Sequence, residues 1–408
     1  MNMNSPLESQ SAAKINTNDN CPCCGSSDIK PFYSAPNVPT NSCLLFDSRE
    51  EALACPTGDI VLGFCQSCGF VYNTKFDLAN TEYSGRYEET QGFSPTFSRF
   101  HTQLAQDLID RHNLHGKKVM ELGCGKGEFL VLLSQLGQNF GIGIDPSALS
   151  ERLEGVEGAE RVRLIPEYYH ESHGAEDVDM LVCKMTLEHI PDAEVFLNLV
   201  RANLGDQTDT LVFFQIPEAL RILKIAAFED IYYEHCAYFT TGSLGRLFRR
   251  CGFDVVKLDT EYDDQYLTIE AKPAAGEPSP PLAVEDDMEQ LVDLVGTFDE
   301  RVDDIRDKWK SVVRNAKSAG KSVLLWGSGS KAVSFLTTLG LGDDVEYVTD
   351  INPHRANYYM PVTGQRIVPP SELPEIKPDL VIIMNRIYEK EITADLNAMG
   401  LHPEIKCL

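Results

Sequence analysis

Two pairs of closely spaced cysteines are the first candidates for chemistry in this sequence. Cys21 and Cys24 form one C-x-x-C turn, Cys65 and Cys68 form another, and a glycine follows each pair. Thiolates two residues apart can hold one Zn²⁺ where the chain turns tightly, and glycine tolerates the positive φ of such a turn. Four thiolates complete a tetrahedron without an open position, so we expect a structural zinc ion.

Other roles for these cysteines are open at this point. They can be ordinary buried residues or a redox pair, although neither pair opens a helix of the thioredoxin kind. Cys23 lies inside the first turn and could replace a neighbour as ligand, with poorer spacing. Cys43 and Cys55 have no partner at metal spacing, so we expect both in the core.

A glycine-rich loop is the second candidate. Gly123, Gly125 and Gly127 lie in the run VMELGCGKGEFL, between a predicted buried strand and a predicted helix. Glycine lets the backbone approach a ligand closely, and the start of the helix offers free amides. The loop alone is shared with dinucleotide sites. Glu121, immediately before it, favours the methyltransferase signature ELGCGKG and therefore S-adenosylmethionine as the ligand.

Further cofactor contacts are expected from residues elsewhere in the chain. Asp145 ends the next predicted strand, where its carboxylate can accept hydrogen bonds from both ribose hydroxyls; its other possible role is to cap the following helix. Glu167, after the third strand, is a weaker candidate for the adenine end. Gln91 and Gly92 are candidates to cover the methionine part, unless they are simple loop residues.

The elements that position these residues alternate between strands and helices. Helical runs at 128–136 and 194–204 separate buried strands, which predicts a parallel sheet with crossover helices. A preceding helix carries Phe97 to Ile109 at helical spacing, and Gly116 can end it. Runs 254–260 and 266–272 predict a terminal antiparallel hairpin, which separates class I methyltransferases from most doubly wound domains. The predicted parallel strands are 118–122, 140–144, 163–166, 180–184 and 211–216.

The length of 408 residues exceeds one ordinary hydrophobic core, so we expect several domains in an α/β protein. A long helical pattern from Met288 to Val312 precedes a second strand, glycine-rich turn and helix. The expected order is a disordered N-terminus (1–20), a zinc-binding domain (21–76), a class I methyltransferase domain with a Rossmann-like core (77–273), a linker (274–282), and a long helix with a C-terminal Rossmann-like substrate-binding domain (283–408).

The charge balance limits the partners. The formal net charge is −26, so phosphate backbones and anionic membranes should repel the protein. We expect a small-molecule substrate and no nucleic-acid or membrane partner. Residues 1–20 lack the basic start and apolar run of a secretory signal, and no later segment is long and apolar enough to span a bilayer. A cytoplasmic protein with mostly reduced cysteines is therefore expected.

Taken together, the motifs resemble the zinc-containing sugar C-methyltransferases, and the resemblance covers nearly the whole sequence from Cys21 onward. That family has an N-terminal zinc-binding domain, a class I methyltransferase core and a C-terminal Rossmann-like domain. Besides the cysteine pairs and ELGCGKG, the motifs that carry the resemblance are LEHIP (187–191), YYEH (232–235) followed by Tyr238-Phe239, WGSGSK (326–331) and KPD (377–379).

The resemblance implies methylation of a nucleotide-linked keto sugar, with His235 as the base. It also implies that Tyr232 and Glu234 lie beside His235, and that His189 and Tyr87 face the same pocket. Chemistry supports this independently, because carbon is a poor nucleophile until a proton α to a ketone is removed. His235 can be the base and Tyr232 the donor to the enolate oxygen. Glu234 can orient the imidazole or bind a sugar amine or hydroxyl.

Other interpretations stay open. Tyr232–His235 can be a packed aromatic corner, and His189 can simply hold its loop. The sequence has YYEH where YHEH is common in the family, and Pro361–Gly364 (PVTG) where PGT is frequent. Both changes fit a different sugar, or O-, N- or C-methylation of another small molecule. The run Gly327–Ala332 with Asp350 resembles an NAD site, although the family resemblance favours a domain that frames the substrate without NAD.

Overall fold

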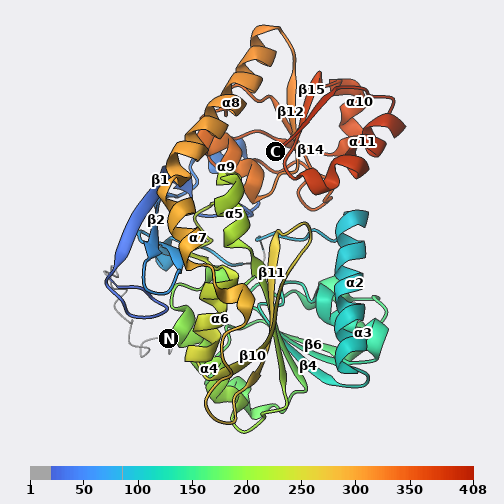
Figure 1. Ribbon diagram of the computed structural model, residues 1–408. Coiled ribbons are helices and arrows are strands. Elements are labelled where there is room, and N and C mark those ends of the chain that lie inside the picture. Colours follow the sequence, from blue (N-terminus) through green and yellow to red (C-terminus); the bar gives the residue numbers. More distant parts are fainter. Residues whose placement is uncertain (1–19, 85) are drawn as a thin grey trace, which may run out of the picture.

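The computed structural model describes residues 20–84 and 86–408 (Figure 1). The N-terminal segment expected to be disordered lies, apart from Asn20, outside the described residues. In the described part of the chain, no helix is both long and apolar enough to cross a membrane.

A seven-stranded sheet forms the centre of the molecule, in the order β10-β11-β8-β7-β4-β5-β6. β4 to β8 pair in parallel, and β10 and β11 form the antiparallel hairpin at one edge. This is the class I methyltransferase topology, so the fold prediction is confirmed. The strands are β4 (Lys118–Leu122), β5 (Phe140–Ile144), β6 (Val162–Ile165), β7 (Met180–Lys184), β8 (Leu211–Pro217), β10 (Phe253–Glu261) and β11 (Tyr266–Pro273).

Helices flank this sheet on both faces (Figure 1). The predicted first helix, α2, ends earlier than expected, at His112 rather than near Gly116. Asn113 takes the left-handed conformation with φ 51°, and its N–H bonds Ile109 O, which closes the helix. The helices are α2 (Pro95–His112), α3 (Glu128–Gly137), α4 (Ala193–Leu204), α5 (Ala219–Ile225) and α6 (Thr241–Arg250).

The cysteine-rich unit forms a second, antiparallel sheet in the order β1-β2-β3-β9. Its strands are β1 (Ile29–Pro39), β2 (Thr57–Cys65), β3 (Val71–Asn73) and β9 (Ala237–Tyr238), and α1 (Arg49–Leu53) lies between β1 and β2. β9 comes directly after the YYEH motif, and it pairs with β3 through Tyr238 opposite Val71. This cysteine-rich sheet is therefore completed by the segment that carries His235.

A third, parallel sheet with the order β14-β13-β12-β15-β16 lies at the C-terminal end (top of Figure 1). Its order and crossover helices are Rossmann-like. The strands are β12 (Val323–Trp326), β13 (Tyr347–Thr349), β14 (Ile367–Val368), β15 (Leu380–Ile383) and β16 (Glu404–Cys407), and the helices are α9 (Ser330–Leu339), α10 (Leu373–Ile376) and α11 (Glu389–Ala398).

The long helix predicted before this sheet is two helices, α7 (Met288–Gly296) and α8 (Phe298–Ser318). The break falls at Thr297, which leaves the helical conformation (φ −120°, ψ 2°) after the poor helix former Gly296. Phe298 is fully buried and packs edge-to-face on Phe32 and Tyr33 of β1. The same hydrophobic cluster continues through α8 to β12, so it joins the cysteine-rich sheet to the C-terminal sheet.

Short 3-10 helices connect the larger elements. They are η1 (Leu78–Asn80), η2 (Ser150–Leu153), η3 (Ala159–Arg161), η4 (Glu171–Ala175), η5 (Leu187–His189), η6 (Phe228–Asp230), η7 (Ala283–Glu285), η8 (Pro370–Glu372) and η9 (Arg386–Tyr388). η5 matters most for the site, because it follows β7 and carries Glu188 and His189.

Candidate active site and cysteine cluster

One cavity of about 720 Å³ lies between the methyltransferase sheet and the C-terminal sheet. Loops that follow the carboxyl ends of strands in both sheets line it, as is usual for ligand sites of open α/β sheets. The glycine-rich loop after β4 contributes Gly123 and Gly125, and the corresponding loop after β12 contributes Gly327 and Gly329. The two glycine loops therefore share one cavity.

The β4–α3 loop requires its glycines. Gly123 has φ +67°, and a Cβ there would lie 2.0 Å from the Thr186 Oγ1 atom. Gly125 has φ +53°, and Gly127, at the N-cap of α3, has φ +82°. Because side chains are excluded, the backbone lies open to a ligand at the start of α3. Gly127 does not line the cavity itself but shapes the loop.

Asp145 lies at the tip of β5 and lines the cavity. Its Oδ2 accepts a hydrogen bond from Gly125 N at 2.9 Å, and its Oδ1 accepts from Ser147 N at 2.7 Å. No helix starts directly after Asp145, because η2 begins at Ser150, so the carboxylate caps a turn instead of a helix. It fastens the glycine loop to β5.

The cavity wall near the glycine loop contains buried titratable groups. Glu121 is buried, and its Oε2 has no hydrogen-bond partner among the described residues. Burial raises the pKa of Glu121 to about 8 and lowers the pKa of Lys184 to about 8. Lys184 Nζ lies 2.9 Å from His101 Nε2. A carboxylate oxygen without a partner, facing a cavity, fits the ammonium group of an amino-acid ligand such as S-adenosylmethionine.

Lys184 and His101 were not predicted from sequence. The sequence signal that could have identified Lys184 is its place as a lysine at the carboxyl end of the buried run 180–184.

The three weaker cofactor candidates differ in position. Gln91 lines the cavity, and its Oε1 accepts a hydrogen bond from Tyr388 OH at 3.1 Å. Glu167 lines the rim of the cavity, with its Oε2 3.2 Å from His170 Nε2. Gly92 is exposed and does not line the cavity; its carbonyl accepts from Ser98 Oγ. The structure therefore brings Gln91 and Glu167 to the cavity and leaves Gly92 outside it.

His235 lines the other part of the cavity and is only 4% exposed. Its ring centroid lies 4.1 Å from that of Tyr232 and 4.7 Å from that of His189. Burial lowers the pKa of His189 to about 4 and holds the pKa of His235 well below its usual value. Both imidazoles are thus neutral at pH 7, which is the form in which a histidine can accept a proton.

The tautomer of His189 follows from its neighbours. Its Nδ1 lies 3.0 Å from the Glu234 carbonyl oxygen and 3.0 Å from Tyr83 OH. A carbonyl oxygen can only accept, so Nδ1 carries the proton and Nε2 keeps its lone pair. His189 is therefore fixed to the YYEH segment by its ring.

Glu234 is fully buried and does not line the cavity. Its carboxylate accepts hydrogen bonds from Ser42 N at 3.0 Å, from Ser42 Oγ at 2.7 Å and from Tyr87 OH at 3.2 Å. Tyr87 itself lines the cavity. The carboxylate of Glu234 thus ties the YYEH segment to the loop at Ser42, which follows β1, and to Tyr87.

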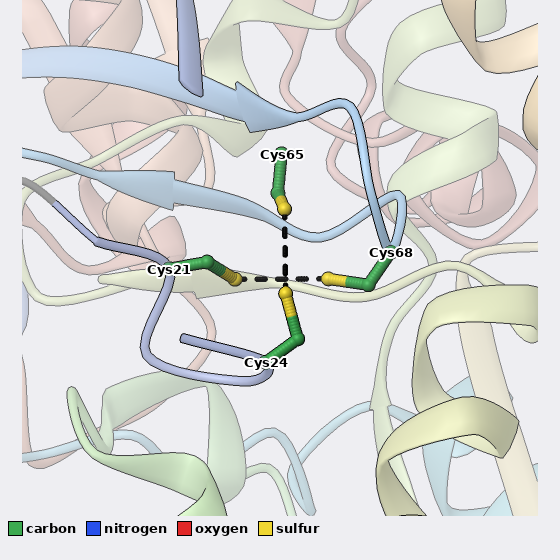
Figure 2. Close-up of side chains that lie close together, drawn as sticks. All are labelled: Cys21, Cys24, Cys65 and Cys68. Carbon is green, nitrogen blue, oxygen red and sulfur yellow. Dashed lines mark hydrogen bonds between the residues drawn. The ribbon is translucent and has the colours of Figure 1, made fainter. Parts of the chain in front are cut away.

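Four cysteine side chains point toward one another (Figure 2): Cys21, Cys24, Cys65 and Cys68. The sulfur atoms of Cys21 and Cys68 lie 3.6 Å apart, as do those of Cys24 and Cys65. A disulfide would bring two sulfurs to about 2.05 Å, whereas tetrahedral zinc with Zn–S of about 2.3 Å separates them by about 3.8 Å. The residues present therefore fit a zinc ion.

The other cysteines of this N-terminal unit are outside the group of four. The backbone N–H of Cys23 donates to Cys21 Sγ at 3.4 Å, while its side chain is not part of the cluster. Cys43 and Cys55 are buried, as expected for core residues. Cys43 in addition lines the cavity, 3.5 Å from Ser330 Oγ.

Comparisons with known proteins agree with a methyltransferase fold. The family described as "Methyltransferase domain" matches residues 97–258, and the family described as "C-methyltransferase C-terminal domain" matches residues 282–401. The C-methyltransferase NovU of Streptomyces niveus is 25% identical over 390 residues, which cover 92% of this chain and 91% of that protein.

Two further relatives match only part of the sequence. The ubiquinone biosynthesis O-methyltransferase of Neisseria meningitidis serogroup C is 28% identical over 171 residues, covering 37% of this chain and 70% of that protein. The structure of Burkholderia thailandensis 1,6-didemethyltoxoflavin-N1-methyltransferase, with bound S-adenosylhomocysteine, covers 44% of this chain and 81% of its own length, with a TM-score of 0.34 and 18% identity.

The sheet topology, the glycine loop with Asp145 and the matching methyltransferase domain define the protein as an S-adenosylmethionine-dependent methyltransferase. Its C-terminal part matches the C-methyltransferase C-terminal domain, and the chain is similar to the C-methyltransferase NovU over nearly its whole length.

Replacing Asp145 by alanine is expected to weaken cofactor binding at least about tenfold. The variant loses the carboxylate that holds Gly125 N and Ser147 N, and each lost charge-assisted hydrogen bond is worth about 1.5–3 kcal/mol. Isothermal titration calorimetry with S-adenosylmethionine checks this. Asp350→Ala, at the corresponding position after β13, is the matched control and should leave the cofactor affinity unchanged. Equal affinity of Asp145→Ala and wild type would remove Asp145 from the cofactor site.

Proposed function

We propose that the protein methylates a carbon atom of a nucleotide-linked keto sugar, with His235 removing the proton α to the ketone. The observation that carries the proposal is the pairing of a buried neutral imidazole with a phenol inside the cavity: His235 and Tyr232 stand 4.1 Å apart, centroid to centroid. When bound, S-adenosylmethionine supplies an electrophilic methyl group. A ketone whose α-carbon is deprotonated supplies the carbon nucleophile that such a group needs.

The two aromatic groups have separate roles in this proposal. His235 takes the proton, and Tyr232 OH donates a hydrogen bond to the oxygen that becomes an enolate. Burial keeps the pKa of Tyr232 well above its usual value, so the phenol keeps its proton and stays a donor. His189 and Tyr87 complete the wall of the same cavity, and Glu234 holds the segment in place from behind.

The C-terminal sheet is proposed to frame the nucleotide part of the substrate. Gly327 has φ +105°, and Ser328 N donates to Asp350 Oδ2 at 2.8 Å, which repeats the Gly125–Asp145 contact of the cofactor loop. The start of α9 adds free amides, and Lys331 and Arg355 line the cavity. These groups suit a diphosphate. We propose that this domain frames the substrate without NAD, and titration with NAD tests that part.

A second candidate is O-methylation. It is favoured by the match to an O-methyltransferase over the methyltransferase domain and by the missing second histidine in YYEH. In that case His235 would remove a hydroxyl proton instead of a C–H proton.

A panel of keto-sugar nucleotides, each incubated with isotopically labelled methyl donor, tests the proposal. We expect one or more members to gain a methyl group on the carbon next to the ketone, located by NMR of the product. Without methyl donor in heavy water, the enzyme should exchange the α-hydrogen of the same compound for deuterium. A methyl ether as product, with no exchange, would support the second candidate instead.

A further inference from the structure

Glu188 is a buried carboxylate to which the proposed mechanism gives no role. It is 1% exposed, it lines the cavity, and neither of its carboxylate oxygens has a hydrogen-bond partner among the described residues. Buried polar groups are nearly always paired, so an unpaired carboxylate at a cavity wall needs an explanation. The sequence motif LEHIP had drawn attention to His189 and not to its neighbour.

The nearest group of complementary chemistry is the imidazole of His235. Its Nε2 lies 3.9 Å from Glu188 Oε1. This is longer than a hydrogen bond, but catalytic hydrogen bonds in unliganded enzymes are often long and tighten when substrate binds. Lys331 of α9 is a cation that lowers the pKa of His235, and it is paired with Asp230.

The backbone fixes the approach of these two side chains. Cys236 N donates to the Glu188 carbonyl at 2.9 Å, and the His189 ring bonds the Glu234 carbonyl. The first contact is made by Cys236, the residue after His235, and the second by Glu234, the residue before it. The η5 turn after β7 and the YYEH segment are thus held face to face, with Glu188 and His235 between the two contacts.

We infer that Glu188 is the positioning residue of the base: its carboxylate orients the His235 imidazole through Nε2–H and stabilises the imidazolium that proton removal creates. This deepens the proposed function and rests on it. The C–H bond breaks, its electron pair becomes the enolate double bond, and the carbonyl π pair moves to oxygen. The proton forms an N–H bond at His235 Nδ1, and after methylation the imidazolium returns it to water.

This role belongs to Glu188 and not to Glu234, the carboxylate that the sequence had suggested as an orienting group. Glu234 directs its oxygens to Ser42 and Tyr87. The same arrangement has been used many times by enzymes in which a buried carboxylate holds a catalytic histidine in one tautomer.

The protonation of the pair supports the inference and gives it a pH signature. Burial raises the pKa of Glu188 to about 8, while burial keeps the pKa of His235 low. The pair therefore holds one proton on Glu188 at neutral pH and becomes carboxylate plus neutral imidazole as the pH rises. Other titratable groups facing His235 are His189, Tyr232, Tyr238 and Lys331. Activity should rise with pH as the pair loses its proton.

Glu188→Gln tests this role, because the amide keeps the shape but not the charge. We expect kcat to fall about 10²–10⁴-fold, the range typical of general bases and their orienting groups, with KM within about threefold of wild type. In wild type, the raised pKa of Glu188 sets the pH below which kcat falls. Glu188→Gln lacks this titratable group, so the fall in kcat should occur at a lower pH. Glu188→Asp should restore part of the rate.

Glu218→Gln is the matched control. Glu218 is also buried, and burial raises its pKa to about 7, but it caps α5 outside the cavity. Its variant should leave the acidic limb where it is. An unchanged kcat and acidic limb in Glu188→Gln would overturn the inference.

A second measurement needs no substrate. ¹⁵N-histidine NMR of the unliganded enzyme, with the His235 signal identified by its loss in His235→Gln, should show His235 titrating together with a neighbour in wild type and alone in Glu188→Gln. Identical titrations in both would also overturn the role. So would a stoichiometric divalent cation that Glu188→Gln fails to bind, because Glu188, His189 and His235 lie close enough to share one. If wild type neither methylates nor exchanges any keto sugar, the proposed function fails while this titration still decides the role of Glu188.

Discussion

His235→Gln is expected to abolish measurable turnover, with a loss of about 10²–10⁴-fold or more, while cofactor affinity stays within about twofold of wild type. The separation of the two effects follows from the architecture. His235 lies on the segment between β8 and β9, whereas the cofactor loop and Asp145 follow β4 and β5. Parallel measurements of turnover and of S-adenosylmethionine binding by calorimetry check both parts.

Deuterium exchange separates loss of the base from loss of structure. Wild-type enzyme in heavy water should exchange the α-hydrogen of its substrate without methyl donor, and His235→Gln should not. Tyr232→Phe is the graded companion: it should slow exchange and methylation about 100-fold, because one donor to a developing oxyanion is worth roughly 3 kcal/mol. If His235→Gln still exchanged and methylated at the wild-type rate, YYEH would be a packing motif and O- or N-methylation the better assignment.

The parts of the fold that could be predicted are those set by local sequence. Buried parallel strands appear as short apolar runs, so β4, β5 and β7 were placed to the residue. The end of α2 was missed because Asn113, and not a glycine, takes the left-handed conformation. The break at Thr297 was missed because the apolar pattern continues across it. Domain boundaries stay predictions, and one hydrophobic cluster joins the cysteine-rich sheet to the C-terminal sheet.

The candidate site was predictable where motifs carry it and not where distant segments meet. The glycine loop lies in one strand–turn–helix unit, and Asp145 follows the next strand along the chain. In contrast, Ser42 and Glu234 are 192 residues apart, and nothing local announces their hydrogen bond. Glu188 resembled an ordinary glutamate of a polar turn, since its burial beside His235 depends on tertiary structure. The assignment of roles within the site stays a prediction that the variants above test.

Cys65→Ser is expected to cause the largest loss of stability of any single change proposed for this protein. We propose that one zinc ion per molecule is held by Cys21, Cys24, Cys65 and Cys68. A closed four-thiolate site contributes folding free energy directly, about 10–16 kcal/mol for zinc-finger peptides at pH 7. Cys65 ends β2 and is fully buried, and Phe64 and Phe70 beside it are buried in the core. Loss of the ion should therefore loosen the β1–β2–β3 sheet.

The measurements are zinc content by elemental analysis and thermal unfolding by circular dichroism. Cys251→Ser is the matched control, because Cys251 is also buried, but its thiol donates to Glu194 O and it is not one of the four clustered cysteines; the variant should keep the zinc and lose much less stability. β9 pairs with β3 directly after the YYEH segment, so unfolding of the zinc domain would release His235 from one side. Below its unfolding temperature, however, Cys65→Ser should alter stability more than chemistry, because a closed site offers no position for substrate.

Wild-type protein purified without chelator and found to contain no zinc would refute the metal assignment, and the cysteines would then be ordinary buried thiols.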